Sequence, residues 1–504
     1  MMLKNLKEFL RHSAVYSISN AAVKASGVIL LPLYTKYMTT SEYGVYAILE
    51  ATLLIIVEIL NLGLHQALVM MNNSPEFSKK KKSIFFSIFA VTLVISVIFI
   101  FIGEFSTPYI SKIFEEPEVF YSYLRIAVYI IALRLIYNLF LNKLRADDQS
   151  GMFTLLNIIK LLIMLTLVIY FVAFAGYKVM GIMYSYLITE ILTFLFVSPL
   201  MFKRMSLVFE KKIVSVAFKF GVPLIFGSVA MMLLNLSDRY IIKYLTDYSS
   251  VGIYNLGYSF AGILNMFLIT PFGLALMPIA YKMFGKEGDT KYYSKILTYL
   301  TYILVWAGLG LSIFSMEIIK TFTLNSSYWP AYKIAPVIIF SYIFFGMRFM
   351  SSLGMFLTRN TKHIAYSTII ASVLNIVLNF IFIPVFGVIA AAYTTLISFI
   401  LLYFVTLHFS NKFYVIQFEH TKLFKVIILG VMFYSLASVT FDMNIYLRFP
   451  IKLFLVILFP YILYLIKFYD PVELDRIFGI LNKWKNPSKW KSNIKSELTN
   501  TLKD

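Results

Sequence analysis

Charged side chains lie inside several long apolar stretches of the sequence, where a charge is costly. The cations are Lys24, Arg134, Lys160 and Arg348, and the carboxylates are Glu50, Glu58 and Glu190. One charge at the centre of a helix in lipid costs about 2.5–3.5 kcal/mol on insertion scales, so each position needs a physical reason. Buried cations can hold a phosphate or pyrophosphate, and buried carboxylates can bind a proton or a sodium ion. Alternatively, the cations pair with the carboxylates, or their long side chains reach the membrane interface.

Small polar residues form a second pattern, because they recur at steps of three and four residues along single helix faces. These stripes include the asparagines Asn20, Asn61, Asn255 and Asn375. Polar groups avoid lipid, so residues that share one face are expected to line protein or water. We therefore predict that the four asparagines line a polar cleft.

The composition indicates that the solvent around these residues is lipid. Of 504 residues, 60% are hydrophobic and only 14% are charged, and the mean hydropathy is +0.80. A soluble protein of this length cannot hide so much apolar surface. Most of the net charge of +20 lies in short loops between apolar stretches, which indicates membrane topology and no nucleic-acid partner. The absence of cysteine excludes disulfides, thiolate chemistry and cysteine-ligated metals.

About fourteen apolar stretches of roughly 18–25 residues are long enough to cross a hydrocarbon core about 30 Å thick. We predict spans at residues 13–33, 44–64, 84–103, 120–140, 154–176, 179–202, 214–236, 252–280, 296–314, 332–356, 363–384, 387–409, 423–441 and 448–466. With the N-terminus in the cytoplasm, the inner segments hold roughly 28 Lys or Arg and the outer loops about 7. This asymmetry predicts a multi-pass protein of the cytoplasmic membrane with both termini in the cytoplasm.

An internal repeat divides the first twelve spans into two blocks. Residues 36–46 and 243–254 both read Lys-Tyr-x-Thr followed by Gly-x-Tyr, and each segment opens a block of six spans. Because six is even, both blocks enter the membrane from the same side, as in a parallel repeat. We expect an all-α fold with two six-helix lobes that face each other across a V-shaped cleft. The predicted parts are a cytoplasmic N-terminus (1–12), an N-lobe (13–209), a C-lobe (210–410), two further helices (411–466) and a basic cytoplasmic tail (467–504).

Signs of catalysis are weak. The five histidines form no H-E-x-x-H motif, and the sequence contains no P-loop. Asp147 and Asp148 lie in an inner loop without a nucleotide-binding domain, so we interpret them as part of a solvated loop. Asp238 and Arg239 are interpreted as a local structural anchor that ends the predicted span 214–236 at the outer face. We expect no enzyme activity, no cofactor and no metal.

Three parts of the sequence resemble the polysaccharide transporters of the multidrug/oligosaccharidyl-lipid/polysaccharide (MOP) exporter superfamily, especially Wzx-type O-antigen flippases. They are residues 31–46, residues 237–240 with 251–254, and residues 375–392, where Ala390 replaces a glycine common in the family. The resemblance extends over nearly the whole chain and implies a MATE-like fold of fourteen helices. It also implies transport of an undecaprenyl-pyrophosphate-linked oligosaccharide (an O-antigen, capsule or exopolysaccharide repeat unit) by alternating access. Membrane lipids, a polysaccharide polymerase and chain-length proteins are the partners it implies.

We therefore expect Lys24 and Arg348, helped by Arg134 and Lys160, to hold the phosphates. Glu50, Glu58 and Glu190 are candidates for ion coupling. The alternative function is a MATE-like multidrug or cation antiporter, for which an acidic, aromatic cavity is expected. The sequence leaves open the glycan, the coupling ion, the oligomeric state, and whether the cations bind substrate or pair with the glutamates.

Overall fold

The computed structural model describes residue 27, residues 29–471 and residues 474–475, and the chain divides into two compact units, Met1–Phe418 and Glu419–Asp504. Every regular element of the described residues is a helix. Thirteen of these helices are long and apolar enough to cross a membrane. Each overlaps one of the predicted spans from the second to the fourteenth, and the first predicted span lies mostly outside the described residues. The prediction of an all-α, multi-pass membrane protein is confirmed.

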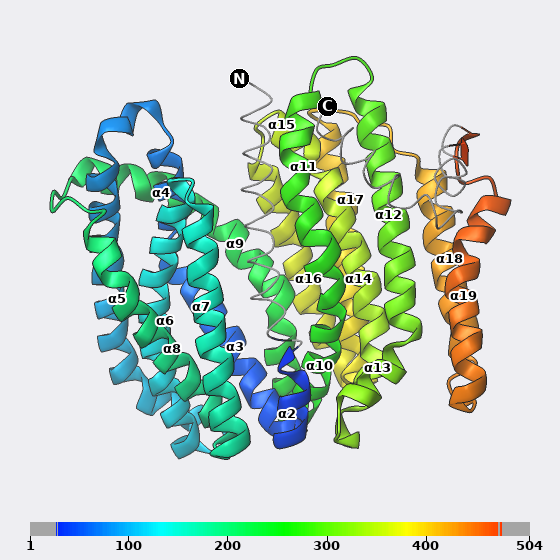
Figure 1. The fold of residues 1–504 in the computed structure, drawn as a ribbon, viewed down its shortest axis with the longest axis horizontal. Coiled ribbons are helices and arrows are strands. Elements are labelled where there is room, and N and C mark those ends of the chain that lie inside the picture. The colour runs from blue at the N-terminus through cyan, green and yellow to red at the C-terminus, as the bar shows by residue number, and fades with distance from the viewer. Residues whose placement is uncertain (1–26, 28, 472–473, 476–504) are drawn as a thin grey trace, which may run out of the picture. The chain divides into compact units, whose positions relative to one another are not determined.

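The first unit contains two sets of helices, labelled as in Figure 1. The first set comprises α2 (Leu31–Tyr37), α3 (Thr40–Asn61), α4 (Leu64–Asn72), η1 (Pro75–Lys80), α5 (Lys81–Ile110), η2 (Ser111–Ile113), α6 (Pro117–Ala146), α7 (Ser150–Ile169), η3 (Tyr170–Phe174) and α8 (Lys178–Phe202). The second set comprises α9 (Lys211–Leu245), α10 (Tyr248–Leu264), η4 (Asn265–Ile269), α11 (Thr270–Met283), α12 (Asp289–Ile313), α13 (Ser315–Phe322), η5 (Ser326–Tyr328), α14 (Ala331–Ser351), α15 (Leu353–Leu357), α16 (Lys362–Phe386) and α17 (Ile389–Asn411).

These two sets form the two predicted lobes (Figure 1). In the N-lobe, α4, α5 and α6 pack around a core that includes Leu68, Phe85 and Phe140. In the C-lobe, α14 packs against α10, α12 and α17. The long helix α9 packs on α16 of the C-lobe and also contacts α3, α4 and α5 of the N-lobe. Helix α9 is therefore the element that runs from one lobe to the other.

Equivalent caps begin the first helix of each repeat. Thr39 and Glu42 form a capping box at the start of α3, with N–O distances of 3.2 Å and 2.8 Å. The side chain of Asp247 accepts a hydrogen bond from the backbone N–H of Ser250 at 2.7 Å and begins α10. The repeat in the sequence therefore places a side-chain cap at the start of the equivalent helix in each lobe.

The two repeat segments cross where α3 meets α10. A methyl group added at Gly44 would lie 1.9 Å from the carbonyl oxygen of Tyr248, and one added at Gly252 would lie 2.0 Å from that of Thr40. Only glycine permits this approach of two backbones, because any side chain would overlap the opposite carbonyl. The Gly-x-Tyr pattern thus marks a contact between the lobes.

Polar contacts close the same end of the molecule. The hydroxyls of Thr40 and Ser249 are 2.7 Å apart, and the hydroxyl of Tyr328 donates to the carbonyl oxygen of Thr39 at 2.8 Å. We call this region, formed by Gly44, Gly252, Thr40, Ser249 and Tyr328, the closed end. The connections at residues 203–210 and 284–288 lie at the opposite end (Figure 1).

Asp238 and Arg239 lie inside α9, which continues past them, so the prediction that they end the helix is wrong. Asp238 is fully buried and accepts hydrogen bonds from the Asn379 amide at 2.6 Å and the Thr395 hydroxyl at 3.0 Å. The Tyr254 hydroxyl also donates to Asp238. These contacts join α9, α10, α16 and α17, so the carboxylate anchors four helices instead of one helix end.

The second unit contains α18 (His420–Ser438) and α19 (Ile445–Leu465), which correspond to the last two predicted spans. The helices pack on each other, with the rings of Phe433 and Phe459 5.8 Å apart. The Lys422 ammonium donates to Asp470 at 2.7 Å.

Candidate functional site

A cavity of 240 Å³ lies between the lobes of the first unit. Its described lining residues are Gly27, Tyr34, Tyr43, Tyr46, Glu50, Ser259, Gly262, Asn265, Met266 and Tyr342. Helices α2 and α3 supply the N-lobe wall, and α10, η4 and α14 supply the C-lobe wall. Among these residues Glu50 is the one with a charged side chain. The cavity is next to the closed end, since Tyr43 and Tyr46 flank Gly44 on α3.

The N-lobe wall of this cavity is a cluster of tyrosine rings. The ring of Tyr34 lies 5.2 Å from that of Tyr46 and 5.9 Å from that of Tyr43. The hydroxyls of Tyr46 and Tyr186 are 3.0 Å apart, which joins the cavity wall to α8. Aromatic faces combined with hydroxyls and a carboxylate suit a ligand that has both apolar and hydrogen-bonding surfaces.

Two of the predicted cations pair with one of the predicted carboxylates. Glu190, on α8, is 1% exposed and accepts hydrogen bonds from Arg134 Nε at 2.9 Å and Lys160 Nζ at 2.6 Å. The Lys160 ammonium also lies 3.9 Å from the centre of the Tyr137 ring. Two cations against one carboxylate leave one net positive charge on this cluster. The pairing alternative left open by the sequence is thus the observed geometry for Arg134 and Lys160.

A single aromatic side chain links this cluster to the cavity. The guanidinium of Arg134 lies 5.6 Å from the centre of the Tyr186 ring, whose hydroxyl meets Tyr46 in the cavity wall. The charge cluster therefore lies behind the N-lobe wall and not on it.

Arg348 lies in the C-lobe, apart from that cluster. Its guanidinium lies 5.2 Å from the centre of the Phe345 ring and 5.4 Å from that of Phe349. Its Nε is buried, and within the described part of the chain its side chain has no hydrogen bond or ion pair. The side chain as a whole is half-buried. A buried donor without an acceptor is costly, so this position is suited to an anionic ligand.

The described asparagines of the predicted polar cleft are buried and hydrogen-bonded within the protein. Asn61 accepts from the backbone N–H of His65 at 3.2 Å, and Asn255 accepts from Arg239 Nε at 2.9 Å. Asn375 is fully buried and accepts from the Asn379 amide at 3.3 Å. The bonds of Asn61 and Asn255 join neighbouring helices, whereas that of Asn375 stays within α16, and none of the three lines the cavity.

The remaining predicted site residues fall in two groups. Lys24 and Asn20 lie outside the described residues. Glu58 is half-buried on α3 and does not line the cavity, in contrast to Glu50 two turns earlier. Metal binding finds no support within the described ranges, where no group of three or more His, Asp or Glu side chains could hold an ion.

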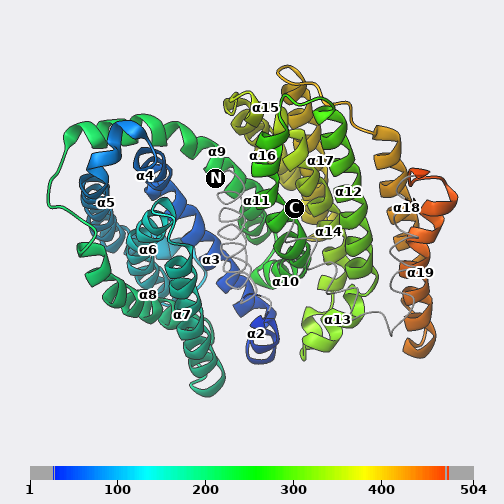
Figure 2. The same ribbon diagram turned by 45° about the horizontal axis from the view of Figure 1, so that its top comes forward.

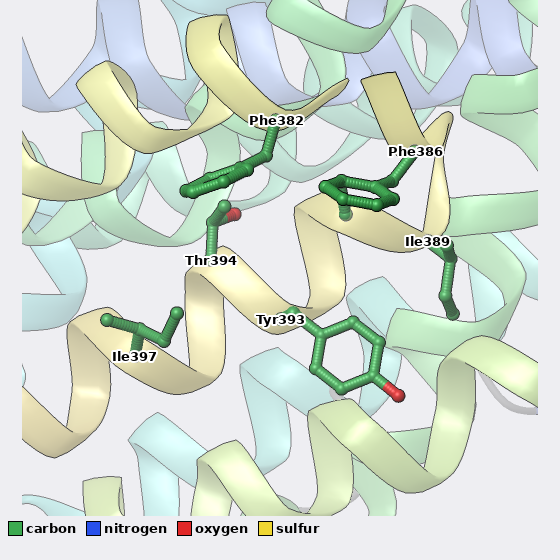
Figure 3. A pocket seen from close by; sticks show the side chains of 7 residues that line it. Phe382, Phe386, Ile389, Tyr393, Thr394 and Ile397 are labelled. Carbon is green, nitrogen blue, oxygen red and sulfur yellow. The ribbon is translucent and has the colours of Figure 1, made fainter. Parts of the chain in front are cut away.

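A second cavity, of 330 Å³, lies at the hairpin between α16 and α17 (Figure 3). It is lined by Phe382, Phe386, Ile389, Ala390, Tyr393, Thr394 and Ile397. Figure 3 shows mainly aromatic and aliphatic side chains around the space, and both helices are membrane spans. A cavity of this composition offers apolar contact and little chemistry, so the inter-lobe cavity is the candidate site.

Residues 9–284 match the model of the protein family described as polysaccharide biosynthesis protein, which is more than half of the chain. The chain belongs to this family. A search of curated proteins gave no match.

Solved structures with the same fold include the lipid II flippase MurJ in an inward closed conformation. That structure has 18% sequence identity and a TM-score of 0.72, and the match covers 90% of this chain and 99% of that one. An inward-facing multidrug resistance MATE family transporter has 14% identity and a TM-score of 0.62, over 84% and 100% of the two chains. A MOP superfamily transporter from Pyrococcus furiosus has 14% identity and a TM-score of 0.59, over 80% and 95%. These structures confirm the predicted MATE-like, two-lobed fold.

The tyrosines of the cavity were not predicted as site residues. Their signal is present in the sequence, because Tyr43, Tyr46 and Glu50 follow each other at steps of three and four residues on one helix face. The stripe is not distinctive in the sequence, because a tyrosine is common in a chain with 36 of them. Tyr342 could not be connected to the stripe, because it comes from the other lobe.

Proposed function

We propose that this protein moves an undecaprenyl-pyrophosphate-linked oligosaccharide across the cytoplasmic membrane by alternating access. Membership of the polysaccharide biosynthesis protein family supports this function. The observation on which the proposal rests most is the polar, tyrosine-lined cavity between two lobes that contact each other at the closed end. Opening of that end, with closure at the other, exposes the same cavity to the opposite side.

The cavity suits the sugar part of such a substrate. A sugar ring presents C–H groups on its faces and hydroxyls at its edge, which match aromatic rings and polar side chains respectively. Tyr34, Tyr43, Tyr46 and Tyr342 supply the rings. Glu50, Ser259 and Asn265 supply hydrogen-bonding groups.

Arg348 is proposed to bind the pyrophosphate, together with Lys24. Arg348 follows the cavity residue Tyr342 by six positions on α14, which is about 9 Å along the helix. It lies on the side away from the closed end, because α14 begins beside Tyr328. The cluster of Arg134, Lys160 and Glu190 contributes one net positive charge behind the opposite wall. In this proposal the pyrophosphate binds farther from the closed end than the sugars do.

The proposed orientation puts the closed end outside and the connections at residues 203–210 and 284–288 inside, following the distribution of Lys and Arg. A polysaccharide polymerase and chain-length proteins would act on the product after its release. The protein itself then changes the side of the membrane on which the substrate lies and breaks no bond in it.

Export of organic cations is the second candidate function. It is favoured by Glu50, the one charged side chain among the described cavity residues, and by the four tyrosine rings around it. Multidrug transporters also have this fold.

Transport by the purified protein in liposomes separates the two functions. The substrate is an undecaprenyl-pyrophosphate oligosaccharide. An enzyme added outside the liposomes acts only on substrate in the outer leaflet and so measures the amount transported. With Glu50→Gln we expect transport of this substrate to fall about tenfold, the value of one hydrogen bond to a charged group. Glu58→Gln, on the same helix but away from the cavity, serves as the control and should retain the full rate. Dye efflux that is lost in Glu50→Gln, with no oligosaccharide transport by the unchanged protein, would contradict the proposed substrate and support cation export.

A further inference from the structure

Two segments far apart in the sequence come together beside the start of α5. The backbone N–H of Glu210 donates to the Ser87 hydroxyl at 3.0 Å, and the hydroxyls of Ser83 and Ser206 are 3.2 Å apart. Lys80 and Glu210 also form an ion pair. The connection between α8 and α9 is therefore held along α5, as Figure 2 shows.

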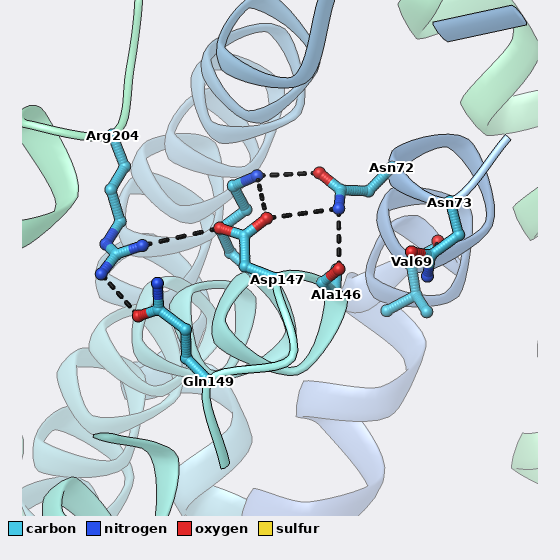
Figure 4. A network of polar contacts seen from close by, with 8 residues as sticks. Val69, Asn72, Asn73, Ala146, Asp147, Gln149 and Arg204 are labelled. Carbon is cyan, nitrogen blue, oxygen red and sulfur yellow. Dashed lines mark hydrogen bonds and ion pairs between the residues drawn. The ribbon is translucent and has the colours of Figure 1, made fainter. Parts of the chain in front are cut away.

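The beginning of this connection is fixed by a second set of contacts (Figure 4). Arg204 donates to the Gln149 side chain at 2.6 Å and lies 3.6 Å from the carboxylate of Asp147. Asp147 in turn accepts from Lys143 at 2.8 Å and from the Asn72 amide at 3.2 Å. Residues 204–210 are thus tied to the N-lobe at both ends, and Asp147 is part of this network.

Three consecutive apolar side chains of the connection nevertheless point outward. Leu207, Val208 and Phe209 are 79%, 52% and 49% exposed. They lie between the spans Lys178–Phe202 and Lys211–Leu245, so they belong to neither membrane helix. Three large apolar residues exposed in a fixed loop need an apolar environment, and the edge of the bilayer supplies one.

Lysines surround these apolar residues. Segments 76–82 and 203–212 contain eight Lys or Arg and two Glu. The exposed ones are Lys79, Lys80, Lys81, Lys82, Lys203, Lys211 and Lys212. The first turns of α5 and α9 hold two lysines each and no acidic residue. Lysines there face the positive end of the helix dipole, so they do not stabilise these helices.

We propose that residues 79–82 and 203–212 form an interfacial anchor that binds the phosphate groups of anionic glycerophospholipids. The apolar side chains of residues 207–209 enter the boundary between headgroups and acyl chains, and the lysines beside them contact the phosphates. Basic clusters immediately next to a membrane helix are typical of sites for anionic lipid. The anchor holds the connection between the two lobes at the membrane surface. It involves none of the residues assigned to transport.

The depth of residue 207 tests the apolar part of this proposal. The chain has no cysteine, so Leu207→Cys gives one labelling site for a nitroxide. The protein is reconstituted in vesicles of phosphatidylcholine and phosphatidylglycerol, and collision of the label with oxygen and with a water-soluble nickel chelate is measured. Glu287→Cys, in the other connection at this end, is the aqueous control, and Phe226→Cys, 66% exposed within α9, is the lipid control. We expect the collision rates of the label at residue 207 with oxygen and with the nickel chelate to equal those at position 226. A collision rate with the nickel chelate equal to that at position 287 would overturn the proposal.

The selectivity for anionic lipid tests the charged part. Spin-labelled phosphatidylglycerol and phosphatidylcholine are compared for association with the full-length protein. Replacement of Lys81, Lys82, Lys211 and Lys212 by Gln should reduce the preference for phosphatidylglycerol at least threefold. The control replaces the same number of exposed lysines in the C-lobe at the same end, namely Lys282, Lys286, Lys291 and Lys362. An equal reduction in both variants would indicate a general charge effect and would overturn a specific site.

Discussion

The charged residues inside the membrane spans have different environments, which separates their roles. Arg134 and Lys160 share the buried carboxylate of Glu190, whereas Arg348 contacts two phenylalanine rings and has no acceptor in the described structure. A paired charge is already compensated, and an unpaired one is ready to bind a ligand. Arg348 is therefore the better candidate for direct contact with phosphate.

The role of the Glu190 cluster can be tested by breaking it in two ways. Glu190→Gln alone leaves two half-buried cations without a counter-charge and should lower the free energy of unfolding by at most about 3–5 kcal/mol. The triple variant Arg134→Gln, Lys160→Gln and Glu190→Gln should recover most of this loss, because no uncompensated charge remains. Thermal unfolding in detergent measures both effects. We expect the triple variant to transport within about threefold of the unchanged protein, because it removes one net positive charge behind the cavity wall and no group that lines the cavity. A stable triple variant that does not transport would show that these cations contact the substrate.

Arg348 should behave in the opposite way. Arg348→Ala removes no hydrogen bond or ion pair seen within the described residues, so the unfolding temperature should hardly change. Oligosaccharide transport in liposomes should fall by about tenfold or more, the value of a charge-assisted hydrogen bond. Arg348→Lys should restore part of the rate, and Lys282→Ala, an exposed lysine at the end of α11, is the control. Full transport by a folded Arg348→Ala protein would exclude this residue from phosphate binding.

At the scale of residues, the charged positions were predictable from the sequence, but the residues that they contact were not. The cost of charge in lipid identified Arg134, Lys160 and Glu190 from their positions alone. That they meet depends on the packing of α6, α7 and α8, which no periodicity specifies. The asparagine stripes were predicted to line a polar cleft, and the described ones, Asn61, Asn255 and Asn375, are buried inside the protein. A helix face against another helix and a face against a cavity have the same period, so the sequence does not distinguish them. The role of Lys24 remains a prediction.

At the scale of elements, the crossing of α3 and α10 determines how the lobes meet. Both helices begin at a side-chain cap and place a glycine one turn later against the opposite backbone. The contact joins equivalent parts of the two repeats. The two copies of the Lys-Tyr-x-Thr and Gly-x-Tyr pattern therefore form the two halves of the closed end. A helix pair in such close contact has little tolerance for added volume.

Gly44→Val should open the closed end. The added side chain overlaps the carbonyl of Tyr248, and overpacking of about 1–3 kcal/mol favours the conformation in which the helices separate. The rate at which a water-soluble maleimide labels Ser249→Cys should rise about tenfold for each 1.4 kcal/mol of that cost. Gly310→Ala in α12 has open space around it and is the matched control. Equal labelling rates in the two variants would indicate that the crossing does not limit opening.

The spans themselves were largely predictable, because their length and hydropathy are set by the bilayer. Thirteen of the fourteen predicted spans overlap a described helix that is long and apolar enough to cross a membrane. The predictions did not show that α9 continues past Asp238 and Arg239, since an apolar pattern interrupted by charges looks like a helix end. In the fold, Asn379 and Thr395 compensate the carboxylate from neighbouring helices, so the helix continues.

At the scale of the whole molecule, the repeat in the sequence predicts two lobes, and the first unit has them. The position of the substrate cavity follows from this architecture, because the walls come from α2 and α3 on one side and α10 and α14 on the other. The tyrosines of its described lining did not follow, because they come together only when residues of both lobes are placed side by side. The predicted cationic cleft stays a prediction, since Lys24 lies outside the described residues.

The most direct test of the central claim is to lock the closed end during transport. Thr40→Cys and Ser249→Cys place two sulfur atoms where hydroxyls now lie 2.7 Å apart, in a chain with no other cysteine. The double variant is reconstituted in liposomes with the undecaprenyl-pyrophosphate oligosaccharide, and transport is measured under oxidising conditions and after reduction. We predict that oxidation abolishes transport and that reduction restores it, with either single variant unaffected. Undiminished transport by the fully cross-linked protein would contradict passage of the substrate through the cavity between the lobes.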